Sequence, residues 1–294
     1  MASPVDLGAV RRRVGETVFS RVAGPEGPEH RTRIHDGVGP RWFGPDRPIR
    51  EVHGDASMFV GGLTALLLQS LHPLAMAGVA GHSDYRGDPW GRLQRTSYFL
   101  AVTTYGPAAD ADRTVARIRG IHRRVKGIAP DGRPYAASDP HLLEWVHVTE
   151  AWSFLRSHTR FGARTLTRDQ RDGYVADLAV VGRKLGVLDP PTTEADLDAR
   201  LEAYRPELAR TAEAAEAARF LLLRPPLPLA VRPPYGVLAA ASVSLLPRWA
   251  RRPLRLPRLP VTETAVVRPA GEILVRTIRW AMTPPATAQL DASA

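Results

Sequence analysis

The chain has 294 residues, a formal net charge of +10 and no cysteine. Without cysteine, disulfides, thiolate catalysis, iron–sulfur clusters and covalently attached c-type haem are excluded, which leaves His, Asp, Glu and Tyr as metal ligands. The positive charge is almost wholly arginine, since Lys126 and Lys184 are the only lysines. Together with the excess of alanine and proline, this indicates a GC-rich coding sequence rather than a nucleic-acid site, so we expect no specific nucleic-acid partner.

The N-terminal part predicts a short amphipathic helix over residues 5–22 and an irregular segment rich in Gly, Pro and Arg over 23–50. A signal peptide would have a continuous apolar core, and the first residues of this chain have none. No run reaches the roughly 18 apolar residues that are needed to span a bilayer. We therefore expect a soluble, cytoplasmic protein.

The most apolar helix is predicted to follow Asp55, a plausible N-cap. A His-Pro pair at residues 72–73 should break it, and a second short helix should run from Leu74 towards Gly81. Three glycines in this stretch are equally compatible with close approach of a helix or flat ligand and with ordinary flexible points: Gly61, Gly62 and Gly78.

Two further helices are predicted over 88–106 and from about 109 to 127. Asp88 caps the first, whose first turn holds Pro89, and Gly106 is a good stop residue. In the second, apolar residues and one histidine recur at spacings of three, four and three: Val115, Ile118, His122 and Val125. This places His122 within an apolar stripe, on a helix whose outer face is strongly basic.

A buried imidazole needs a partner, because an unpaired buried polar group costs roughly 1–3 kcal/mol. For His122 that partner is either a metal centre or a backbone carbonyl, and the pattern alone favours the carbonyl. On the preceding helix, Arg92 and Thr96 are four apart and so share one side. They place a cation and a hydroxyl at the edge of an apolar face, unless Arg92 is simply solvated and Thr96 bonds back to its own helix.

A helix from Pro140 to about residue 161 turns His147 and Glu150 towards the same surface. Glu144 and His147 have the Glu-x-x-His spacing of di-iron bundles, but the sequence contains no second such motif. The remaining histidines lie at predicted loop or helix ends and have no ligand-like spacing: His53, His72, His82, His141 and His158.

Helices are also predicted over 167–186, 193–204, 211–223 and 271–282. Residues 225–260 hold nine prolines and predict an extended segment wrapped over the helical body, with one helix-like piece at 236–246. Strand-like alternation is nearly absent, so the fold class is all-α: a single large helical domain over 1–260, with its core at about 40–250, and a C-terminal helix and tail over 261–294. Gly-x-Gly-x-x-Gly, Walker A and Gly-x-Ser-x-Gly motifs are missing, which disfavours nucleotide enzymes and serine hydrolases.

Four segments carry a resemblance to a known family: REVHGDASMFVGGLTALLLQSLHPLAMAGVAGHSDY, DPWGRLQRTSYFLAVTTYG, IHRRVKG and SDPHLLEWVHVTEAWSFLRSHTRFG. The chain resembles the oxygenase MpaB family, which includes the catalytic domain of the bacterial latex-clearing proteins (rubber oxygenases). The most specific feature is Arg-x-x-x-Thr followed one helix later by His-x-x-Val.

The resemblance implies an all-helical, globin-like or related fold that holds non-covalent haem b. It implies His122 as the proximal iron ligand, and Arg92 and Thr96 as residues beside the haem. The rubber oxygenases have a lysine where this chain has Arg95, and a guanidinium is hardly ever deprotonated, so Arg95 would not ligate iron as a neutral amine does. The iron would then be five-coordinate, or capped by water or oxygen.

The first hypothesis is therefore a haem-dependent oxygenase or peroxidase-like oxidoreductase that acts on an apolar small molecule with O₂ or peroxide. In it, Arg92 pairs with a propionate or polarises bound oxygen, Thr96 donates a hydrogen bond near the distal face, and His147 and Glu150 line the pocket. The alternative is a haem carrier, sensor or interaction protein without catalysis. Five arginines near the C-terminus are the candidates for a weak membrane-surface contact: Arg248, Arg251, Arg252, Arg255 and Arg258. The oligomeric state is left open.

Overall fold

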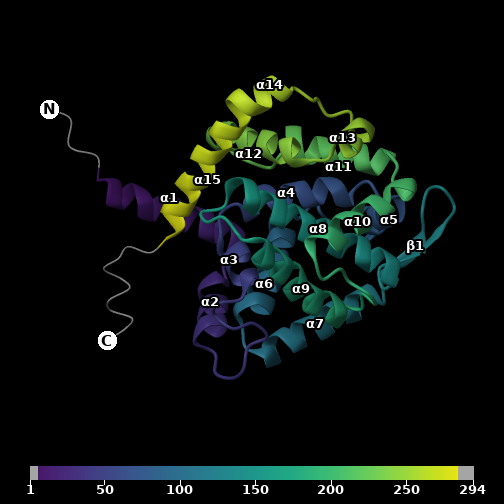
Figure 1. Ribbon diagram of the computed structural model, residues 1–294, viewed down its shortest axis with the longest axis horizontal. Coiled ribbons are helices and arrows are strands. Elements are labelled where there is room, and N and C mark those ends of the chain that lie inside the picture. The colour runs from purple at the N-terminus through teal and green to yellow at the C-terminus, as the bar shows by residue number, and fades with distance from the viewer. Residues whose placement is uncertain (1–5, 284–294) are drawn as a thin grey trace.

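The computed structural model describes residues 6–283, and these form an all-α fold with one small hairpin (Figure 1). This confirms the predicted fold class. The first eight helices are α1 (Leu7–Ala23), α2 (Gly27–Asp36), α3 (Pro48–Gly54), α4 (Met58–Gln69), α5 (Pro73–His82), α6 (Pro89–Tyr105), α7 (Ala108–His122) and α8 (Pro140–Phe161). The others are α9 (Arg168–Leu185), α10 (Glu194–Ala203), α11 (Ala212–Leu223), α12 (Arg232–Leu245), α13 (Arg248–Leu254), α14 (Pro260–Thr262) and α15 (Arg268–Met282), with short turns η1 (Arg205–Glu207), η2 (Leu229–Val231) and η3 (Glu263–Val267). Between α7 and α8, β1 (Lys126–Ile128) pairs antiparallel with β2 (Pro134–Ala136).

The main core surrounds α8, which α3, α4, α9, α10 and α12 all contact. Asp139 caps α8 by accepting a hydrogen bond from the His141 backbone N–H. Trp145 and Val148 are fully buried along its length. The helix α4 lies closest to it because Gly61 leaves no side chain in the way: a Cβ there would be 2.7 Å from the Phe154 ring. Close helix approach is thus the role of Gly61.

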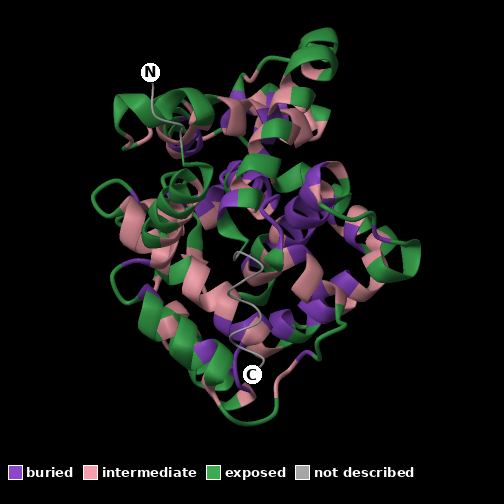
Figure 2. Ribbon diagram, turned by 90° about the vertical axis from the view of Figure 1, so that its left-hand side faces the viewer, coloured by how far each residue is buried: buried purple, intermediate pink, exposed green. Residues whose placement is uncertain are grey.

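The apolar α4 is an interior helix, with Leu67 and Leu68 fully buried, and Figure 2 shows such buried positions concentrated within the helical body. The predicted break at residues 72–73 is present, and α4 and α5 meet at an angle of 107°. Among the described helices, none is by itself long and apolar enough to cross a bilayer.

Two segments predicted to be irregular or extended are more helical than expected. Residues 23–50 include α2 and the start of α3, and 225–260 include η2 and α13 as well as α12, which covers most of the helix-like piece at 236–246. In α2, α3 and α12, proline occupies the first turn, where its missing N–H would have had no helical partner. The proline content of these segments therefore marks helix starts as well as loops.

The helix α7 ends at His122 rather than at Gly127. Residues after it pair in the β1–β2 hairpin, whose turn contains Gly132 with a φ of 85°. The Val125 carbonyl accepts from the Ala137 backbone N–H, so hairpin bonds replace the helical ones. Val125 consequently lies beyond the helix that carries the rest of the predicted stripe.

At the C-terminal end, α15 contacts α1 and α12. Arg279 of α15 donates to both carboxylate oxygens of Asp55, at 2.8 and 2.9 Å, which fixes the start of α4. Arg251 is buried and pairs with Glu263 at 2.6 Å. It therefore cannot belong to an exposed basic cluster, whereas Arg252 and Arg258 are exposed.

Candidate functional site

His122 is the last residue of α7, and its position follows from the apolar stripe of that helix. Ala111 and Val115, on the same face, are buried against the helical body. The imidazole is half-buried, and its Nδ1 is fully enclosed. Burial lowers the pKa of His122, so the ring is neutral at neutral pH.

Within residues 6–283, neither ring nitrogen of His122 has a hydrogen-bond partner. The backbone carbonyl that would make it an ordinary core histidine is therefore not in place. Only Nδ1 is buried, so its lack of a partner is what costs roughly 1–3 kcal/mol, and His147 and His158 also have enclosed ring nitrogens without a partner.

Arg92, in the first turns of α6, is half-buried rather than solvated. Burial lowers the pKa of its guanidinium, and the nearby Tyr85 phenol opposes this only in part. No carboxylate among the described residues forms an ion pair with it. A desolvated cation without a counter-ion is costly, so this position favours an anionic ligand.

Arg95 and Thr96 have different surroundings from Arg92. The Arg95 side chain is 67% exposed and pairs with Asp88 at 3.1 Å. The Thr96 hydroxyl donates to the Arg92 backbone carbonyl at 3.0 Å, which is the back-bonded geometry considered above, and only its acceptor lone pairs remain free. Across the described chain, none of these three side chains hydrogen-bonds to His122.

His147 and Glu150 form a second polar group on α8. The His147 ring packs against Gly182 of α9, where a Cβ would be 3.0 Å from ring atoms, and its Nε2 is enclosed without a partner in the described structure. Burial, helped by the charge of Arg183, lowers the pKa of His147 to about 4. Burial raises the pKa of the Glu150 carboxyl to about 7.

Glu144 does not share a site with His147. Its carboxylate pairs with Arg200 and accepts from the Tyr204 hydroxyl at 2.9 Å. The Glu-x-x-His spacing is therefore used for two unrelated contacts rather than for a di-iron site.

His53 of α3 was not among the candidates from the sequence. Its ring points towards α6 and α9. Its Nδ1 is 2.8 Å from the Thr104 hydroxyl, and its Nε2 is 3.4 Å from the Tyr174 hydroxyl. Burial lowers the pKa of His53 to about 3. Glu150 is among the charges that raise the pKa of Tyr174, so this chain of polar groups leads towards α8. No spacing in the sequence could have joined residues so far apart.

Burial is the main influence on the pKa of five partly exposed titratable side chains: His53, Arg92, His122, His147 and Glu150. Shifted pKa values are common at functional sites, which makes these side chains candidates. Tyr105 and Tyr235 share the same property, so burial by itself does not single out a site.

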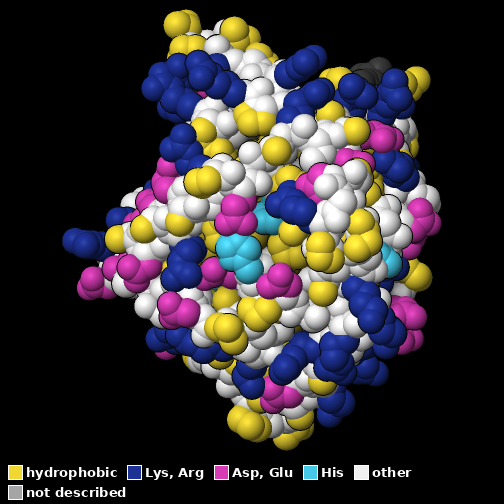
Figure 3. Space-filling view, turned by 90° about the vertical axis from the view of Figure 1, so that its right-hand side faces the viewer, with side chains coloured by type: hydrophobic (Ala, Val, Ile, Leu, Met, Phe, Trp, Pro, Cys, Tyr) yellow, Lys and Arg dark blue, Asp and Glu magenta, His cyan; other side chains and the backbone are white. Residues whose placement is uncertain are grey.

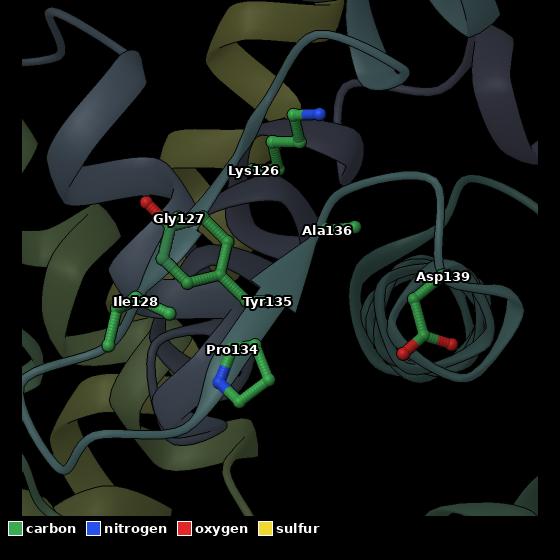
Figure 4. A pocket seen from close by; sticks show the side chains of 7 residues that line it. All are labelled: Lys126, Gly127, Ile128, Pro134, Tyr135, Ala136 and Asp139. Carbon is green, nitrogen blue, oxygen red and sulfur yellow. The ribbon is translucent and has the colours of Figure 1, made fainter.

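The β1–β2 hairpin carries a separate, open pocket of about 460 Å³ (Figure 4). Lys126 and Tyr135 line it, and Asp139 faces it from the start of α8, which is seen end-on. The Tyr135 ring lies over Gly78 of α5, with its carbons 3.6 Å from where a Cβ would be. None of the five titratable residues named above lines this pocket.

A scan against protein families matches residues 50–280 to the ER-bound oxygenase mpaB/B'/rubber oxygenase catalytic domain. No curated protein and no solved structure gave a match. The matched region holds the five partly exposed titratable residues named above, together with Arg95 and Thr96. The chain therefore belongs to the family of mpaB/B' and rubber oxygenase catalytic domains, whose chemistry is oxygenation.

Proposed function

We propose that this protein is a haem-b-dependent oxygenase or peroxidase-like oxidoreductase that uses O₂ or peroxide on an apolar small molecule. One observation carries the cofactor assignment: His122 is a neutral, half-buried imidazole with no hydrogen-bond partner for either nitrogen among the described residues. The substrate class rests on the family, whose name includes rubber oxygenases.

The residues present fit a haem group. A neutral imidazole is the commonest protein ligand of haem iron. The desolvated guanidinium of Arg92, which has no carboxylate partner within residues 6–283, suits a negatively charged propionate. Bound haem would supply the iron at which oxygen is activated.

The protein's own side chains would then divide the work of binding and proton transfer. His122 would hold the iron, and Arg92 would orient the group by a charge-assisted hydrogen bond. Thr96 has its proton engaged by the Arg92 carbonyl, so it would contribute as an acceptor or through its methyl group unless the hydroxyl rotates. Arg95 would remain on the surface with Asp88.

Glu150 is the candidate for holding a proton in the proposed site. A carboxyl whose pKa is about 7 is partly protonated at neutral pH, so it can both give and accept a proton at its oxygen. His147, whose pKa is about 4, stays neutral in the same range. The two side chains thus differ in charge state although they lie one helical turn apart.

The absorption spectrum of the protein as isolated tests the cofactor. We expect a Soret band, and haem extraction should give one haem b per chain. Oxygen consumption with an apolar alkene would then establish the activity. Haem without oxygen consumption would instead favour a carrier or sensor, and a chain that neither contains nor takes up haem would overturn the proposal.

A further inference from the structure

A cluster of two imidazoles and one carboxylate lies outside the site described above. His72 immediately precedes α5, His141 is in the first turn of α8, and Glu207 closes η1. One ligand atom from each residue lies within 4.8 Å of the other two. On the side of the molecule shown in Figure 3, histidine side chains reach the surface beside acidic ones.

The distances within the cluster are close to those of a metal site. The His72 Nε2 is 3.4 Å from Glu207 Oε2, and the His141 Nε2 is 2.8 Å from the same oxygen. With metal–ligand bonds of about 2.0–2.2 Å, tetrahedral zinc places its ligand atoms about 3.3 Å apart. The first spacing already matches, and the second would have to open by about 0.5 Å. His141 and Glu207 expose 49% and 40% of their side chains, so they have room to move.

A second observation points to a ligand between these residues. The His72 side chain is only 2% exposed, and its Nε2 is enclosed without a hydrogen-bond partner in the described structure. Its approach to Glu207 is within ion-pair distance but does not have hydrogen-bond geometry. A buried nitrogen that lies 3.4 Å from a carboxylate oxygen, near a second imidazole, and has no hydrogen bond is well placed to bind a cation.

Outer contacts hold two of the rings in place. The His141 Nδ1 is 3.3 Å from the Tyr204 hydroxyl, which in turn lies 2.9 Å from Glu144. The His72 Nδ1 is 3.5 Å from the Ala75 backbone N–H, at the limit of hydrogen-bond range. In this contact His72 Nδ1 accepts, whereas binding through Nε2 requires the tautomer with its proton on Nδ1, so metal binding would give up the contact and leave two N–H groups facing each other at this long distance.

We propose that His72, His141 and Glu207 bind one divalent transition-metal ion, with Zn²⁺ as the preferred ion. Two imidazoles and a carboxylate are a known zinc ligand set, and they leave the fourth position to water. The ligands come from three segments that are far apart in the chain, so the ion would fasten the start of α5 and η1 to the start of α8. This site is independent of the haem proposal.

The test uses the full chain without a histidine tag, stripped with a chelator and titrated with Zn²⁺. We expect one tightly bound equivalent by calorimetry and metal analysis, and a rise in Tm on binding. Co²⁺ in place of Zn²⁺ should give the visible absorption of a tetrahedral ion. Because His72 is buried and its replacement could unfold the chain, the informative variants are His141→Ala and Glu207→Gln, which alter partly exposed side chains.

Each of these variants should weaken Zn²⁺ binding by more than about 100-fold, which exceeds the effect of losing an outer-shell partner. The matched control is His30→Ala, because His30 and Glu26 form a His–carboxylate pair at 3.4 Å within α2. Its Zn²⁺ affinity should equal that of the wild type. The proposal is overturned if the wild type binds no Zn²⁺ at micromolar concentration, or if His141→Ala and Glu207→Gln bind it as tightly as the control.

Discussion

His122 on α7 and His147 on α8 look alike in sequence but have different surroundings. Both lie on the apolar side of a helix, and both have an enclosed ring nitrogen without a hydrogen bond in the described structure. His147 is in the middle of a long helix, pressed against Gly182 and one turn from Glu150. His122 is at the end of its helix, and burial alone shifts its pKa.

Under the proposed function, this difference would separate two chemical roles that periodicity cannot distinguish. At the end of α7, no protein charge competes for the imidazole of His122, which suits a metal ligand. On α8, a neutral imidazole stands beside a carboxyl that titrates near pH 7, which suits proton transfer. The assignments can be tested by changing one region at a time.

The largest expected effect is loss of haem from His122→Ala. The Soret band should disappear while the far-ultraviolet circular dichroism remains helical, because Ala111 and Val115 still bury the face of α7. His147→Ala is the matched control and should keep the Soret band. The reverse pattern, with haem kept by His122→Ala and lost by His147→Ala, would exchange the two roles.

Arg92→Ala should reduce haem retention without abolishing it. A hydrogen bond to a charged group contributes about 1.5–3 kcal/mol. Its loss corresponds to a haem affinity that is about 10- to 150-fold lower. Haem transfer to apomyoglobin measures this directly. Arg95→Ala, which removes an exposed guanidinium three residues away, should behave as the wild type. Equal haem loss from both variants would show that Arg92 makes no specific contact.

Glu150→Gln should change the pH dependence of stability. The folded carboxyl keeps a proton that the unfolded chain releases between pH 4.5 and about 7, so Glu150 lowers the free energy of unfolding as pH rises through that window. The glutamine variant avoids this loss and should be more stable than the wild type above pH 7, by at most about 3 kcal/mol. His147, with its pKa lowered to about 4, acts in the opposite direction between pH 4 and 6.5 in both proteins.

Denaturation with guanidinium chloride at pH 5 and pH 8 measures the difference in the free energy of unfolding between the wild type and Glu150→Gln. Glu16→Gln, at an exposed position of α1, is the control and should show no pH-dependent change relative to the wild type. A Glu150→Gln stability difference that is the same at both pH values would mean that the carboxyl is already ionised at pH 5, and would remove it as a proton carrier.

The smallest expected effect concerns the membrane surface. Exposed apolar side chains, among them Val261 at 80% and Ile273 at 66%, lie in the same C-terminal region as four of the five arginines considered above. We expect weak flotation with anionic liposomes at low salt that is lost at physiological salt. The test variant replaces only the four positions outside the buried ion pair, namely Arg248, Arg252, Arg255 and Arg258, with glutamine.

That variant spares Arg251, whose pairing with Glu263 is structural. Strong flotation of the wild type at physiological salt, abolished by the four substitutions, would make the protein a peripheral membrane enzyme. Flotation that the substitutions leave unchanged would show that the arginines take no part.

Most of the helices could be predicted from the sequence, because capping and apolar periodicity are local. Asp88 caps α6 as predicted, and the helices expected from Pro140 and over 167–186 are present as α8 and α9, which Asp139 and a Thr167–Gln170 capping box begin. The same local rules predict His122 within an apolar stripe, whereas the family motif around Arg92 came from a resemblance. The local rules failed where proline was taken as a sign of loop, since proline also opens helices such as α2 and α3.

Which polar groups meet depends on how the helices pack. His53, Thr104 and Tyr174 come together from three helices, and Glu144 is drawn to Arg200 rather than to His147. His72, His141 and Glu207 are so far apart in the chain that no spacing rule connects them. The physical reason is that a side chain's pKa and partners depend on the burial and charges contributed by other helices, and those are fixed only when the helices pack.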